Sequence, residues 1–238
     1  MTKSPTILAF DTSGPHCAAA LMIDGAIVAS RHEDMQRGQA ERLFPMLDEV
    51  MQDTGAVWDE IDAIGVGIGP GNFTGTRIAV SAARGLGLAQ NVPAIGVSTF
   101  EIYFEIAKSP AGKVAVCVPG PRESAYFQVF ANGEAEGSPL FEPAIVPNCP
   151  PWSHPPDTVV GPNHKGLGYS ITDSFGMAGM LTVPIPILDS LEKERATAIA
   201  SATQHKFLAG QTMGRPSPLY IRPADAAPRK DAAIAIFP

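Results

Sequence analysis

Cysteine is scarce in this 238-residue chain, and its spacing argues against two kinds of site. Cys17, Cys117 and Cys149 are odd in number and include no Cys-x-x-Cys pair. This pattern disfavours both a disulfide framework and a cysteine zinc site. We therefore expect the three thiols to behave as small buried hydrophobic side chains.

Two common catalytic patterns are also missing. None of the five histidines are four residues apart, so no pair can present two imidazoles to a metal from one helix face. No Gly-x-Ser-x-Gly segment is present to carry a serine nucleophile. The sequence therefore predicts no catalytic residue, no metal site and no cofactor.

The chain lacks long apolar runs and an excess of positive charge. No stretch approaches the roughly 20 apolar residues that cross a bilayer, and the segment MTKSPTILAFDTS has no apolar signal-peptide region. We expect a cytoplasmic protein without membrane contact. The net charge of −7 disfavours broad, independent binding of nucleic acid, so a partner would have to supply most phosphate contacts to any RNA.

Glycine, in contrast, is concentrated in one stretch, Gly65–Ala89, with the sequence GVGIGPGNFTGTRIAVSAARGLGLA. It reads as the end of a buried strand, a glycine-rich turn and a helix whose one face consists mostly of small side chains. No Gly-Lys-Ser/Thr follows the turn, so it is not a P-loop. The turn either offers backbone amides to an anion or forms a tight strand-to-helix connection.

The order of apolar runs predicts an α/β fold. It opens with three antiparallel strands whose first turn carries Asp11, and strands then alternate with helices, which indicates a ribonuclease-H-like lobe. A second group of strands repeats the opening theme and ends in a helix. The expected strands are Thr6–Phe10, Cys17–Ile23, Ala26–Ser30, Ile61–Ile68, Pro93–Val97, Val114–Val118, Ala125–Phe130 and Thr158–Val160, with Pro184–Leu188 extended. The expected helices are Gln39–Asp53, Thr76–Gln90, Thr99–Lys108 and Leu191–Ala209, and the proline-rich segment 138–162 is expected to be mostly loop.

The first turn holds Asp11, Thr12 and Ser13, whose carboxylate and hydroxyls could meet magnesium-bound phosphates. Against this, the turn has no Gly-x-Gly, Pro15 removes an amide donor, and these are ordinary turn residues. Two alternatives to a purely structural turn stay open: a vestigial nucleotide contact, or a stand-alone ATPase or phosphotransferase that uses Asp11.

Five segments occur in an order that resembles a known family. ILAFDTS, QAERLFPMLDEVM, GIGPGNFTGTRIAVSAARGLGLA, GVSTFE and PLYIR together look like TsaB, the non-catalytic subunit of the bacterial machinery for tRNA threonylcarbamoyladenosine. The likeness covers about residues 6–108 and then residues 218–222. The family's usual stretch at the start of its second lobe is replaced here over residues 119–126.

The resemblance implies two ribonuclease-H-like lobes of the actin/Hsp70/sugar-kinase (ASKHA) type. We expect an N-terminal lobe at 1–108, a smaller C-terminal lobe at 109–220 and an irregular tail at 221–238. It also implies a scaffold that pairs with the catalytic subunit TsaD and works with the ATPase TsaE. The complex modifies the adenosine next to the anticodon in ANN-decoding tRNAs, so tRNA would be met only through the complex.

The resemblance further implies that the two helices of the first lobe form the pairing surface, either with TsaD or, in the free protein, with a second copy. A peptidase label can accompany this family, but nothing in the sequence supports proteolysis. The residues expected at the partner interface are Leu43, Leu47, Val50, Met51, Arg77, Ala79, Ala82, Ala83 and Leu86.

Overall fold

The computed structural model describes residues 4–107, 112–120, 124–142, 157–162, 181–185, 193–211 and 214–221. Residues 222–238, 121–123 and Cys149 lie outside these ranges, as do residues 143–156 in the middle of the predicted proline-rich segment. At the two described ends of that segment, residues 138–142 belong to a strand rather than to the expected loop, and residues 158–162 form the strand expected at Thr158–Val160. None of the helices within these ranges has the length and hydrophobicity that a bilayer crossing requires.

The first sheet has the strand order β3-β2-β1-β4-β5. Its strands are β1 (Ile7–Asp11), β2 (His16–Ile23), β3 (Ala26–Asp34), β4 (Ala63–Gly67) and β5 (Ala94–Val97). β1, β2 and β3 pair antiparallel, whereas β4 is parallel to both β1 and β5. Asp24 and Gly25 both have positive φ angles, which is the geometry of a tight hairpin turn between β2 and β3. The predicted opening hairpins are confirmed.

The second sheet repeats the same pattern in the order β10-β9-β6-β7-β8. It consists of β6 (Lys113–Pro119), β7 (Ala125–Ala131), β8 (Glu134–Glu142), β9 (Thr158–Pro162) and β10 (Leu181–Ile185). β6, β7 and β8 pair antiparallel, and β9 is parallel to β6 and β10. Three antiparallel strands followed by two parallel ones in each sheet give the duplicated, ASKHA-type α/β architecture that the sequence predicts.

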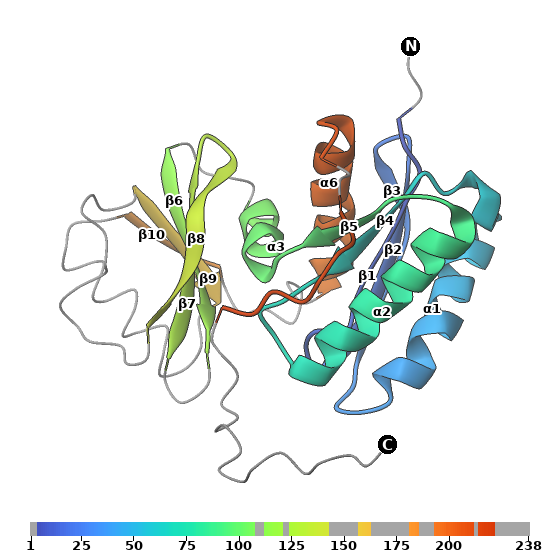
Figure 1. Cartoon of the computed structure of the whole chain (residues 1–238), viewed down its shortest axis with the longest axis horizontal. Coiled ribbons are helices and arrows are strands. Elements are labelled where there is room, and N and C mark those ends of the chain that lie inside the picture. The colour runs from blue at the N-terminus through green and yellow to red at the C-terminus, as the bar shows by residue number, and fades with distance from the viewer. Residues whose placement is uncertain are drawn as a thin grey trace, which may run out of the picture.

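Helices cover both faces of the first sheet (Figure 1). One face packs against α1 (Gln39–Thr54) and α2 (Phe73–Gln90), and the 3-10 turn η1 (Trp58–Glu60) follows α1. The other face packs against α6 (Arg195–Leu208) and α3 (Thr99–Ile106). Alternate residues of β1 point to opposite faces, Leu8 and Phe10 toward α1 and α2, Ile7 and Ala9 toward α6.

The two sheets are joined through α3. Its aromatic residues Phe100, Tyr103 and Phe104 pack against β6, β7 and β9 of the second sheet, while Ile102 packs on the first. The helix starts with the predicted capping box, in which Ser98 and Glu101 satisfy each other's backbone amides. The predicted division at residue 108 would place α6 in the second lobe, whereas α6 packs on the first sheet. The lobe boundary stays a prediction.

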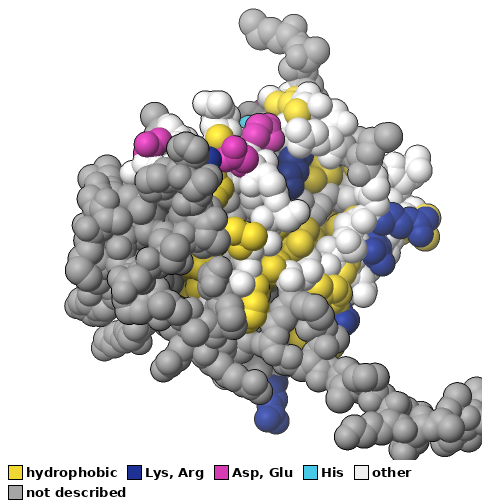
Figure 2. Space-filling model, turned by 60° about the vertical axis from the view of Figure 1, so that its left-hand side comes forward, with side chains coloured by type: hydrophobic (Ala, Val, Ile, Leu, Met, Phe, Trp, Pro, Cys, Tyr) yellow, Lys and Arg dark blue, Asp and Glu magenta, His cyan; other side chains and the backbone are white. Residues whose placement is uncertain are grey.

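Charged side chains are unevenly spread over the face drawn in Figure 2. In Figure 2, hydrophobic side chains lie across the middle of the described surface and acidic side chains gather near the top, whereas Lys and Arg side chains are scattered. No continuous basic surface, the usual electrostatic footprint of nucleic-acid binding, runs through the described residues of this face.

Candidate functional site

The turn after β1 carries a fully buried carboxylate that is already paired. Arg195, the first residue of α6, donates its Nε to Asp11 Oδ2 at 2.8 Å, although the two residues are 184 positions apart in sequence. The Nε2 of His16 lies 3.2 Å from the same oxygen. Ser13 donates its backbone amide to Oδ1 and its hydroxyl to Oδ2. We refer to Asp11, Ser13, His16 and Arg195 as the Asp11 cluster.

The charge of this cluster is fixed by its neighbours. Burial by itself would raise the pKa of Asp11, but the positive charge of Arg195 and the bonds from His16 and Ser13 outweigh it. The pKa of this carboxyl is therefore held well below its ordinary value. The carboxylate is therefore ionised at neutral pH, and both of its oxygens accept hydrogen bonds from groups of the chain itself.

Three glycines of the glycine-rich stretch serve to pack the chain against this turn. A Cβ added to Gly67 would press on the Asp11 carboxylate, and one added to Gly71 would press on the Ser13 carbonyl. At Gly75 it would overlap the carbonyl oxygen of Thr12. Thr12 in turn donates its hydroxyl to the Gly75 carbonyl at 2.7 Å. The glycines thus allow a tight strand-to-helix connection, one of the two uses that the sequence left open.

Backbone donors at the start of α2 are also engaged. The side chain of Asn72 accepts from the amides of Thr74 and Gly75, and its carbonyl accepts from the amide of Thr76. The Asn72 amide itself donates to the Ser13 carbonyl at 2.6 Å. These internal bonds occupy the amide groups that an anion would need at this helix start.

The structure separates the predicted partner-interface residues into two groups. Six of them are buried within the chain's own core against the first sheet: Leu43, Leu47, Val50, Met51, Ala79 and Ala83. Their helical spacing marks the face of α1 and α2 that packs inward, which is the commoner meaning of such spacing. Arg77, Ala82 and Leu86 stay partly accessible. In the isolated chain these six side chains pack inward, although Leu43 also borders the groove described next, and the predicted partner interface stays a prediction.

The accessible surface of the two helices is a groove of about 760 Å³. Phe44 of α1 and Phe73 of α2 are 48% and 64% exposed, a large apolar area to leave in water. The groove, called here the α1–α2 groove, is lined by Ala40, Leu43, Phe44, Phe73, Thr74, Arg77, Ile78, Ser81, Ala82, Gly85, Leu86 and Ala89. The residues that sequence reasoning missed are the two phenylalanines, which stand out as bulky apolar side chains off the inward-facing spacing.

At one end of the groove, the positively charged side chain of Arg77 lies against two aromatic rings. The guanidinium carbon of Arg77 lies 3.1 Å from the centroid of the Phe73 ring and 5.2 Å from that of Tyr220. Tyr220 belongs to the late PLYIR segment, which is tied to the glycine-rich stretch by a bond from the Leu219 amide to the Ile68 carbonyl. Segments that resemble the family at opposite ends of the sequence therefore meet at the start of α2.

Thiol and metal chemistry find little support among the described residues. Cys17 and Cys117 are free and buried, as predicted, and burial raises the pKa of Cys17 to about 12, so its thiolate is scarce at neutral pH. Within the described ranges no three His, Cys, Asp or Glu side chains are grouped so that they could hold a metal ion.

Comparison with known proteins identifies the family. The family model described as "TsaD: tRNA N6-adenosine threonylcarbamoyltransferase" matches residues 27–146, half of the chain. The chain belongs to this family. Several relatives are named TsaB: the Escherichia coli "tRNA threonylcarbamoyladenosine biosynthesis protein TsaB" is 34% identical over 59% of this chain and 64% of its own length. TsaB of Haemophilus influenzae is 35% identical over 43% of each chain.

These TsaB alignments span less than two thirds of the relatives' own lengths. Solved structures give fuller coverage. A Pseudomonas aeruginosa protein described as similar to the peptidase YeaZ is 28% identical, with a TM-score of 0.71, over 92% of this chain and 100% of its own. YeaZ from P. aeruginosa is similar at 28% identity and a TM-score of 0.69, over 91% of this chain and 99% of its own. The comparisons support the predicted TsaB membership rather than a stand-alone phosphotransferase.

Proposed function

We propose that this protein is a non-catalytic scaffold subunit of the machinery that makes N6-threonylcarbamoyladenosine in tRNA. The observation that carries the proposal is the state of Asp11, whose carboxylate is buried and bonded to Arg195. The turn in which a stand-alone ATPase would place its metal-linked carboxylate is instead a structural joint between β1 and α6. The TsaB names of its relatives support the pathway.

A TsaD-type subunit is the partner that fits the proposal. The α1–α2 groove offers it exposed aromatic side chains, Phe44 and Phe73, with Arg77 beside them. Aromatic and arginine side chains are enriched in the parts of interfaces that contribute most to binding. The partner would carry the transfer chemistry and most phosphate contacts to tRNA, in keeping with the acidic net charge of this chain. A TsaE-type ATPase would join the same complex.

The decisive experiment is co-purification of this chain with a TsaD protein, followed by titration calorimetry. We expect Phe44→Ser to weaken the complex by at least about tenfold, since truncating a central aromatic contact commonly costs 2 kcal/mol or more. Leu208→Ser is the matched control, because Leu208 is an exposed leucine, 65% accessible, at the end of α6 and outside the groove.

Three outcomes would contradict the proposal. If the groove variant and the control bind TsaD equally well, the groove is not the docking surface. If the purified chain alone binds Mg-ATP tightly and hydrolyses it with multiple turnovers, it is an enzyme rather than a scaffold. A self-association that Phe44→Ser abolishes, without any TsaD binding, would assign the groove to a homodimer instead.

A further inference from the structure

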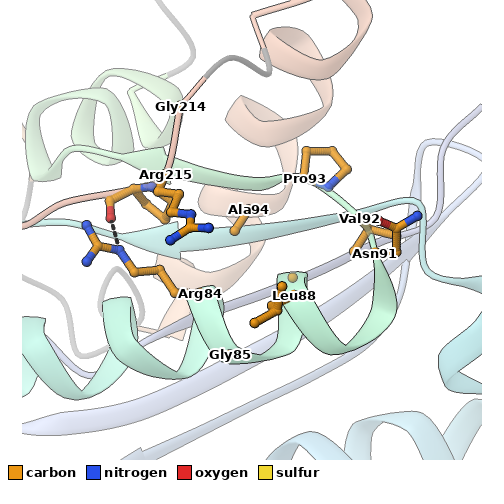
Figure 3. A pocket seen from close by; sticks show the side chains of 11 residues that line it. Arg84, Gly85, Leu88, Asn91, Val92, Pro93, Ala94, Gly214 and Arg215 are labelled. Carbon is orange, nitrogen blue, oxygen red and sulfur yellow. Dashed lines mark hydrogen bonds between the residues drawn. The ribbon is translucent and has the colours of Figure 1, made fainter.

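A second pocket lies at the opposite end of α2 from the Asp11 cluster, and it is built by three separate segments. The last turns of α2, the loop into β5 and the C-terminal segment 214–216 surround a cavity of about 560 Å³ (Figure 3). Its volume is within the usual range for small-molecule sites. The lining residues are Arg84, Gly85, Gly87, Leu88, Asn91, Val92, Pro93, Ala94, Gly214, Arg215 and Pro216.

The pocket carries two positive charges and no negative one among the described residues. Arg84 and Arg215 both line it, and neither forms an ion pair within the described part of the chain. Both arginines are exposed, so water screens their mutual repulsion, but together they give this hollow a positive charge in a protein whose net charge is −7. An anion in the hollow would accept charge-assisted hydrogen bonds from them.

Arg84 is held in place by a contact that leaves its outer nitrogens available. Its Nε donates to the carbonyl of Pro216 at 2.6 Å, which fixes both the guanidinium and the C-terminal segment (Figure 3). Pro216 is also close to β5, since a Cβ on Gly96 would lie 3.5 Å from it. The two terminal nitrogens of Arg84 keep the fork geometry that matches phosphate oxygens.

The pocket also lies at the C-terminal end of α2, whose backbone carbonyls bear on its charge. A helix C-terminus carries partial negative charge on its free carbonyls. Here the carbonyls of Gly87 and Leu88 accept from the amides that follow them, those of Asn91 and Val92. Two of the last four carbonyls of α2 are thus paired, and the charged side chains among the described lining residues are the two guanidinium groups.

The rest of the wall is apolar and has room for a flat group. Leu88 is 78% exposed, an unusual state for leucine, and lies in the pocket near Ala94 (Figure 3). Val92, Pro93 and Pro216 complete the apolar wall, while the Asn91 amide adds a polar group. Nothing lies within 4 Å of the position that a Cβ would take on Gly85. An anionic head next to an apolar, planar body is the chemistry of a nucleotide.

We propose that Arg84 and Arg215 bind the phosphate of a nucleotide whose base lies against Leu88, Val92 and Pro93. The nucleotide is either free or a unit of single-stranded RNA, which share this chemistry. The site shares only Gly85 with the α1–α2 groove and does not depend on the proposed scaffold role.

The test is titration of the full chain with AMP, inorganic phosphate, adenosine and a five-nucleotide single-stranded RNA. We expect AMP to bind more tightly than phosphate, and adenosine to bind least. Arg215→Gln should weaken AMP binding by about tenfold, as expected for losing one charge-assisted contact. This variant leaves the Arg84–Pro216 bond intact, so its effect does not come from a displaced C-terminal segment. Arg37→Gln is the control for overall charge, because exposed Arg37 lies outside the pocket.

The RNA titration distinguishes the two sources. Binding of RNA that exceeds binding of AMP and is lost in Arg215→Gln would assign the phosphate to RNA, whereas preference for AMP would assign it to a free nucleotide. The proposal is overturned if neither probe binds at millimolar concentration. It is also overturned if Arg215→Gln and Arg37→Gln change the affinities equally.

Discussion

The Asp11 cluster and the α1–α2 groove both lie next to α2, but the cluster is buried in the chain and the groove is exposed to water. In the cluster, every charged or hydroxyl group is buried and bonded within the chain. In the groove, two phenylalanines are largely in water. The polar residues for which the sequence left a nucleotide contact open are bonded within the chain, whereas two bulky apolar side chains that the sequence did not single out are exposed to water. Each of the following changes tests that division.

The largest effect is expected for Asp11→Ala. Removing the carboxylate breaks its ion pair with Arg195, which is only 4% exposed, and breaking a buried ion pair in this way costs about 3–5 kcal/mol. Urea denaturation of the wild type and the variant measures the difference. The double variant Asp11→Ala/Arg195→Met removes both charges and should regain most of the loss. A cost below about 1 kcal/mol would mean that the cluster is not a structural joint.

Acid should weaken the same joint. Because the folded-state pKa of Asp11 is lowered from its ordinary value near 3.8, the ionised carboxylate stabilises the fold at pH values above that ordinary value. This contribution is lost progressively as the pH falls below about 4. The free energy of unfolding of the wild type should therefore fall more steeply there than that of Asp11→Ala/Arg195→Met. Parallel pH profiles for the two proteins would contradict this.

Gly75→Ala tests the packing of α2 on the turn. The added methyl group would overlap the Thr12 carbonyl, and overpacking of this kind costs about 1–3 kcal/mol. The backbone at both positions would have to move apart, since neither atom is the end of a flexible side chain. Thermal unfolding gives the measurement. An unchanged midpoint would show that α2 can shift away from the turn without loss.

How far the sequence predicts these features depends on how local they are. The hairpin at Asp24-Gly25, the Ser98 capping box and the glycine-rich turn all rest on neighbouring residues, and each is found as predicted. The pairing of Asp11 with Arg195 joins residues 184 positions apart, and no local pattern indicates it. The burial of a helix face is predicted only in part. Spacing correctly groups Leu43, Leu47 and Val50 on one face, but it does not say whether that face meets the chain's own sheet or a partner.

Phe73→Ser tests whether the exposed α1–α2 groove contributes to the stability of the fold. Phe73 is 64% exposed and touches mainly Arg77 and Tyr220, so losing its ring should cost less than about 1 kcal/mol of stability. Phe10→Ala is the matched comparison, because Phe10 is fully buried and such truncations cost about 3–5 kcal/mol. Chemical denaturation of both variants gives the two values. Equal losses would show that the ring in the groove belongs to the fold and is not held available for a partner.

The smallest effect, and one of opposite sign, is expected for Gly85→Ala. Gly85 lies on the same helix as Gly75, but nothing lies within 4 Å of the position of its missing Cβ. Replacing a glycine in a helix interior by alanine stabilises the helix by up to about 1 kcal/mol, which would raise the midpoint of thermal unfolding by about 2–4 °C. A fall in that midpoint would show that the groove side of α2 is as tightly packed as its Gly75 end. Gly85 lines both the α1–α2 groove and the pocket that contains Arg84 and Arg215. A variant that is more stable yet binds TsaD or AMP less tightly would show that the added methyl group interferes with binding and not with folding.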